Sequence, residues 1–65
     1  MKRYKVNEII KMLEKDEWYL VATNGSHRQF KHKTKKGRVT INGKLSETLG
    51  QELLNSIFKQ AGWSK

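Results

Sequence analysis

Apolar residues recur with a helical period near both ends of the chain, which predicts one helix at each end. The first helix is expected over residues 5–15, where apolar positions follow the i, i+3, i+4, i+7 spacing of a one-sided helix. These positions are Val6, Ile9, Ile10 and Leu13. The second is expected over residues 48–61, because Thr48 and Gln51 match a capping box and Gly62 is a natural stop. Its apolar stripe is Leu53, Leu54, Ile57, Phe58 and Ala61.

The middle of the chain has the pattern of strands joined by glycine turns. Residues 18–23 are rich in aromatic and β-branched side chains and predict a first strand. Asn24-Gly25 readily adopts positive φ angles, so it predicts a type I′ hairpin turn into a second strand over residues 26–32. A polar loop, 33–37, leads to a third strand over residues 38–42, with Val39 and Ile41 inward and a break at Asn42-Gly43.

These elements predict an α+β fold in the order α-β-β-β-α, forming one domain over residues 1–65. A three-stranded antiparallel sheet with both helices on one face lets all the apolar stripes share one core, and Trp63 is expected to fold back onto it. In the second strand, Phe30 is the only large apolar residue and should face this core, with Arg28 and His32 on its side. Period-two geometry then places His27, Gln29 and Lys31 on the opposite, open face.

The composition narrows the partners that this domain can have. The chain has 65 residues and no cysteine, which excludes a disulfide framework and thiolate metal sites. A domain this small is marginally stable alone, so self-association or a heteromeric complex is a reasonable expectation. No apolar run reaches the roughly 20 residues of a membrane span, and no signal-peptide core follows the basic N-terminus. We therefore expect no membrane association and a cytoplasmic location.

The charge is strongly positive and unevenly distributed. Fourteen Lys and Arg residues against six Asp and Glu residues give a net charge of +8, which suggests a polyanionic partner. No acid lies between residues 28 and 44, whereas this stretch contains Arg28, Lys31, Lys33, Lys35, Lys36, Arg38 and Lys44. A solubilising surface is the alternative, but such surfaces usually mix both signs. We favour a surface that binds RNA phosphates, which supplies affinity without reading base sequence.

His27 is the candidate catalytic residue, because it follows the predicted turn and is expected to point away from the core. Nearby cations favour the neutral imidazole, which is suited to taking a proton from an RNA 2′-hydroxyl while lysines stabilise charge on the phosphate. The hydroxyl then attacks the adjacent phosphorus, and no metal is required. The alternative is that His27 is a strand residue that bonds a backbone carbonyl or a base.

Other side chains are weaker candidates for catalysis, metal binding or base stacking. His32 should be a packed or capping residue, and its odd separation from His27 puts the two rings on opposite faces, which argues against a shared metal site. Ser26 lacks a base held by an acid and is expected to bond the turn backbone. The aromatic residues Trp18, Tyr19 and Trp63 are candidates for base stacking, although aromatics in so small a core are more often structural.

Several segments together resemble the HicA toxin family over nearly the whole chain. They are Ile9-Ile10-Lys11-Met12-Leu13, Glu17-Trp18-Tyr19-Leu20-Val21, Gly25-Ser26-His27, Phe30-Lys31-His32, Gly37-Arg38-Val39-Thr40 and Asn55-Ser56-Ile57-Phe58-Lys59-Gln60-Ala61-Gly62. The resemblance implies a fold like the double-stranded-RNA-binding domain. One departure follows the third strand, where many members carry Pro-His or a similar pair and this chain has Asn42-Gly43-Lys44.

The resemblance also implies a toxin of a type II toxin–antitoxin system, an mRNA interferase inhibited by a HicB-type antitoxin. The family's catalytic histidine falls on His27 and its motif glycine on Gly25. We therefore expect a metal-independent endoribonuclease without cofactors. Its expected RNA-binding residues are Gly25, Ser26, Arg28, Lys31, Lys33, Lys35, Lys36 and Arg38. A non-catalytic RNA-binding module and an adaptor that binds only protein are the competing classes.

Overall fold

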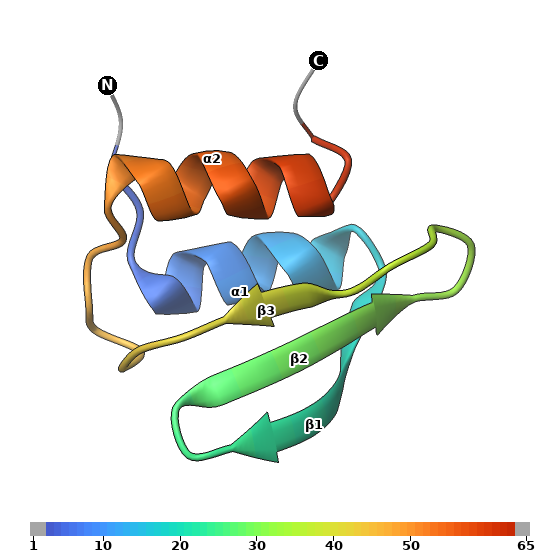
Figure 1. Cartoon of the computed structure of the whole chain (residues 1–65), viewed down its shortest axis with the longest axis horizontal. Coiled ribbons are helices and arrows are strands. Elements are labelled where there is room, and N and C mark those ends of the chain that lie inside the picture. The colour runs from blue at the N-terminus through green and yellow to red at the C-terminus, as the bar shows by residue number, and fades with distance from the viewer. Residues whose placement is uncertain (1–2, 64–65) are drawn as a thin grey trace.

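A computed structural model describes residues 3–63, which form two helices and three strands in the predicted α-β-β-β-α order. The elements are α1 (Val6–Lys15), β1 (Trp18–Asn24), β2 (His27–His32), β3 (Val39–Ile41) and α2 (Gln51–Gln60). The strands form an antiparallel sheet in the order β1-β2-β3 (Figure 1). This confirms the expected topology, and the arrangement fits a double-stranded-RNA-binding-domain-like fold.

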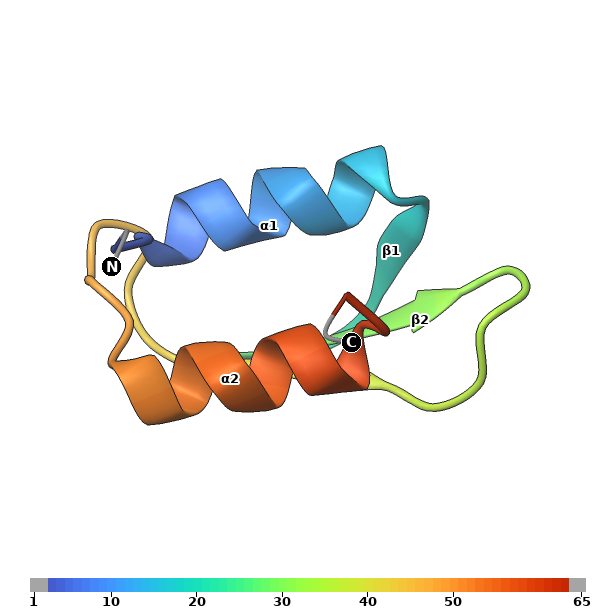
Figure 2. The ribbon, with the colours of Figure 1, turned by 90° about the horizontal axis from the view of Figure 1, so that it is seen from above.

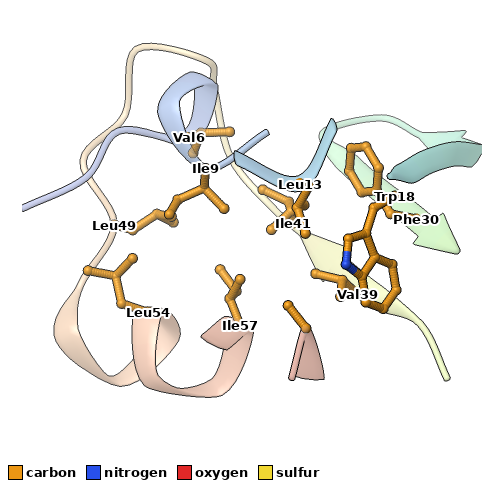
Figure 3. Close-up of a cluster of buried hydrophobic side chains, with 11 residues drawn as sticks. Val6, Ile9, Leu13, Trp18, Phe30, Val39, Ile41, Leu49, Leu54 and Ile57 are labelled. Carbon is orange, nitrogen blue, oxygen red and sulfur yellow. The ribbon is translucent and has the colours of Figure 1, made fainter. Parts of the chain in front are cut away.

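The two helices lie side by side and pack against the sheet, with the core between them (Figure 2). Figure 3 shows Ile41 of β3 beside Leu13 of α1, with Ile57 of α2 pointing into the same cluster. The buried apolar residues are Val6, Ile9, Leu13, Trp18, Phe30, Val39, Ile41, Leu49, Leu54, Ile57 and Ala61. Leu53 was expected in this core, but it is 50% exposed because it lies on the outer side of α2.

The hairpin between β1 and β2 differs from the predicted type I′ turn on Asn24-Gly25. Asn24 pairs with His27, so the two loop residues are Gly25 and Ser26. Gly25 has a φ of +62°, whereas Asn24 and Ser26 do not have positive φ, and glycine at the first loop position is typical of a type II′ turn. The cause is an irregular register between Leu20 and Ala22, which adds one residue to β1 and shifts the turn.

The start of α2 also differs from the prediction, since the capping box of Thr48 and Gln51 does not form. Thr48 instead makes a β-bridge with Lys5, and the N-cap is Gly50. The same loop completes α1, because the backbone N–H groups of Val6 and Asn7 donate to carbonyls of the 45–47 segment at 2.9 and 3.0 Å. These donors have no partner inside their own helix, so tertiary pairing outweighs the local capping preference.

The end of α2 agrees with the prediction. Gly62 has a φ of +75° and stops the helix, and the Trp63 N–H donates to the Phe58 carbonyl at 2.8 Å. This reversal folds Trp63 back onto the domain, with its ring edge-on to Phe58 at 5.3 Å between centroids.

Candidate functional site

His27 is the first residue of β2 and follows directly after the Gly25-Ser26 turn. Its side chain is exposed, and it forms no hydrogen bond or ion pair with any residue between 3 and 63. The turn lies at the end of the sheet that is remote from both helices (Figure 1). The imidazole is therefore accessible to a ligand from solvent.

One surface of the sheet, which we call the open face, carries His27, Gln29 and Lys31 of β2. Phe30 is buried against the helices, so its alternating neighbours point the other way, as predicted. Lys31 is four positions after His27, which corresponds to about 13 Å along the strand. The open face therefore has an imidazole at one end and an ammonium group at the other.

Arg38 lies over the middle of the open face. Its guanidinium donates from Nη1 to Oε1 of Gln29 at 2.7 Å. Gln29 pairs with Thr40 of β3, which explains how an arginine two residues before Thr40 reaches it. The basic residues in the sequence point to Arg38 but not to Gln29, because this contact depends on the β2–β3 register. The contact brings a positive charge to Gln29, which lies between His27 and Lys31 in the sequence of β2.

Two of the predicted RNA-binding cations are already bonded within the fold. Arg28 is half-buried and donates from Nη1 to the Gly43 carbonyl at 2.8 Å. Lys35 donates from Nζ to Oδ2 of Asp16 at 2.7 Å and to the Ala61 carbonyl at 3.1 Å. Lys33 and Lys36, in the loop after β2, are exposed and form no such bond with any described residue.

His32, at the far end of β2, is engaged on both ring nitrogens. Nδ1 accepts from the backbone N–H groups of Thr34 and Lys35 at 3.0 and 3.1 Å. Nε2 therefore carries the proton and donates to the Asp16 carbonyl. The ring also stacks edge-on against Trp18 at 5.1 Å between centroids. The expectation of a packed, capping histidine is confirmed.

The Asp16 carboxylate is the centre of a group of hydrogen bonds that was not predicted from the sequence, which we call the Asp16 cluster. Oδ2 of Asp16 accepts from the indoles of Trp18 and Trp63 at 3.0 and 2.9 Å, and from Lys35. Hydrogen bonds from Lys35 and then Trp63 lower the pKa of this carboxyl from 3.8 to about 2. The cluster joins the end of α1 to β1, the 33–38 loop and the C-terminal segment.

Among residues 3–63, no three histidine, cysteine, aspartate or glutamate side chains gather closely enough to hold a metal ion. The Ser26 hydroxyl has no base or acid bonded to it there. Neither described helix is long and apolar enough to cross a membrane.

The model of a protein family, described as the HicA toxin of bacterial toxin–antitoxin systems, matches residues 6–63. The matched residues include both helices, the whole sheet and His27. No curated protein matches the chain.

Proposed function

The chain belongs to the HicA toxin family, and on this premise we propose that it is an endoribonuclease that cleaves mRNA with His27 as its general base. Membership of a toxin–antitoxin family implies an antitoxin partner. The observation that carries the catalytic proposal is the state of the two histidines. The His32 ring nitrogens are both used by the fold, whereas the His27 ring is exposed and unbonded within residues 3–63.

The proposed reaction is an internal transesterification of the RNA chain. His27 takes the proton from a ribose 2′-hydroxyl, and the 2′-oxygen attacks the adjacent phosphorus. The bond from phosphorus to the 5′-oxygen breaks, and that oxygen takes a proton from water. The products are a 2′,3′-cyclic phosphate and a 5′-hydroxyl. Arg38 is proposed to stabilise the charge that develops on the phosphate, because its guanidinium is bonded to Gln29, which lies two residues from His27 on the open face.

The other predicted site residues divide into phosphate contacts and residues that position the site. Lys31, Lys33 and Lys36 are exposed and are proposed to bind phosphates of the RNA strand. Gly25 and Ser26 form the turn that presents His27. We assign Arg28 and Lys35 to positioning, because Arg28 ties the turn region to the Gly43 carbonyl and Lys35 belongs to the Asp16 cluster.

Inhibition by a HicB-type antitoxin is proposed to work by covering the open face. An acidic partner surface laid over Lys31 and Arg38 would shield His27 from RNA and pair with the positive charge of the toxin. A heteromeric toxin–antitoxin complex would then be the inactive form.

The proposal is tested by incubating purified protein with single-stranded RNA in the presence of a chelator. We expect the wild-type protein to cut RNA and His27→Ala to cut at least about 100-fold more slowly, while still binding RNA. A substrate with one 2′-deoxyribose at the cleaved position should resist the wild-type protein. Cleavage by pure His27→Ala at the wild-type rate would overturn the catalytic role, and binding without cleavage by the wild type would favour a non-catalytic RNA-binding module.

A further inference from the structure

The three aromatic residues considered for base stacking have very different surroundings. Trp18 is 2% exposed and belongs to the core. Trp63 is half-buried, stacks on Phe58 and donates its indole N–H to Asp16. Tyr19 is 47% exposed and forms no hydrogen bond or ring contact with a described residue. Tyr19 is therefore the member of this group that has an accessible ring.

Tyr19 lies on the same side of the sheet as His27. It pairs directly with Lys31 in the β1–β2 register, and directly opposed side chains are about 5 Å apart at their Cβ atoms. Its neighbour Leu20 pairs with Phe30 and therefore points to the other side. The open face thus has a ring and an ammonium group side by side, about 13 Å along β2 from the imidazole.

We propose that Tyr19 is a base-stacking residue for single-stranded RNA, and that the RNA strand runs along β2 from His27 to Lys31. This inference rests on the proposed function. An exposed aromatic ring next to a cation is the combination with which proteins bind single strands, since the ring stacks on a base and the cation binds the backbone. The bases of a duplex are already stacked on each other, so this face selects unpaired RNA.

The test measures RNA affinity in a His27→Ala background, which prevents cleavage during the measurement. A short fluorescently labelled single-stranded RNA is titrated at constant salt, and binding is followed by anisotropy. We expect Tyr19→Ala to weaken binding by about 5- to 100-fold, while Tyr19→Phe binds like the parent. Leu20→Ala is the matched control, since Leu20 is 51% exposed on the opposite side of the same strand.

A second measurement separates stacking from any loss of structure. An abasic nucleotide is moved along the RNA, starting from the cleaved position. In the parent protein, one abasic position a few nucleotides away should weaken binding, and the same change should have no further effect on Tyr19→Ala. An equal penalty in both proteins, or an unchanged affinity of Tyr19→Ala, would overturn the stacking role. A parent protein with no RNA affinity at low salt would overturn the proposed function as well.

Discussion

The two ends of β2 carry the same residue type in opposite circumstances. At one end, His27 is exposed and has no side-chain partner among residues 3–63. At the other end, His32 uses both ring nitrogens, one toward the Asp16 carbonyl and one toward two backbone N–H groups. These ends lie on opposite sides of the molecule (Figure 1). A histidine fixed by the fold and one that is available to a ligand therefore lie only five positions apart in one strand.

If His27 is catalytic as proposed, residues that stabilise this small domain and residues that carry its chemistry lie at opposite ends of β2. The Asp16 cluster connects four segments of the chain through one carboxylate oxygen, which supplements an apolar core of limited size. The His27 end is held mainly by backbone pairing and by the Arg28 contact to Gly43. Changes at the two ends should consequently affect different measurements.

The largest effect on stability is expected from Asp16→Ala. This change leaves the indoles of Trp18 and Trp63 and the Lys35 ammonium group without their acceptor. We expect the free energy of unfolding to fall by about 2–3 kcal/mol, measured by urea denaturation. Glu14→Ala removes an exposed carboxylate nearby and should change it by less than about 0.5 kcal/mol. Equal changes in the free energy of unfolding for the two variants would show that the Asp16 cluster does not stabilise the fold.

A smaller effect on stability is expected from lowering the pH, and it acts through Asp16 at the His32 end of β2. The pKa of Asp16 is 3.8 without its partners and about 2 in the fold. The ionised carboxylate therefore adds stability that is complete above about pH 4 and disappears as the pH falls toward 2. We expect the difference in unfolding free energy between wild type and Asp16→Asn to narrow over this range. A difference that stays constant from about pH 5 to pH 2 would contradict the assigned cause.

The smallest effect is expected at the open face, where Lys31→Ala should leave stability unchanged. Since each phosphate contact releases counterions, losing one should reduce the slope of log affinity against log salt by about 1. The slope is measured from RNA titrations at several salt concentrations. Lys11→Ala on α1 is the matched control, because Lys11 is also exposed but lies away from the sheet. Identical salt slopes for Lys31→Ala and Lys11→Ala would show that RNA does not bind along the open face.

Local patterns predicted much of this molecule. The helical stripe of α1 and the alternation around Phe30 depend only on neighbours in sequence, so the topology and the facing of His27 followed from them. The sequence also predicted that Trp63 folds back and that His32 is packed. Leu53 was wrongly predicted to be buried, because the apolar face of the second helix is broad and its sequence does not show which edge faces solvent.

The remaining features depend on contacts between distant parts of the chain. The hairpin turn moved by one residue because of an irregularity in β1, and Thr48 lost its capping role to pairing with Lys5. The Asp16 cluster joins residues up to 47 positions apart. The contact of Arg38 with Gln29 requires the strand register. None of these contacts can be predicted from the short-range periodicity of the sequence.

The central claim is tested most directly by the cleavage rate constants of folded His27→Ala and His32→Ala, each expressed per folded molecule. The account predicts that His27→Ala unfolds like the wild type and loses cleavage by at least about 100-fold. It predicts that His32→Ala is less stable by about 1–2 kcal/mol and cuts RNA at the wild-type rate. A folded His27→Ala protein that cuts RNA normally, or a folded His32→Ala protein that does not cut it, would contradict the account.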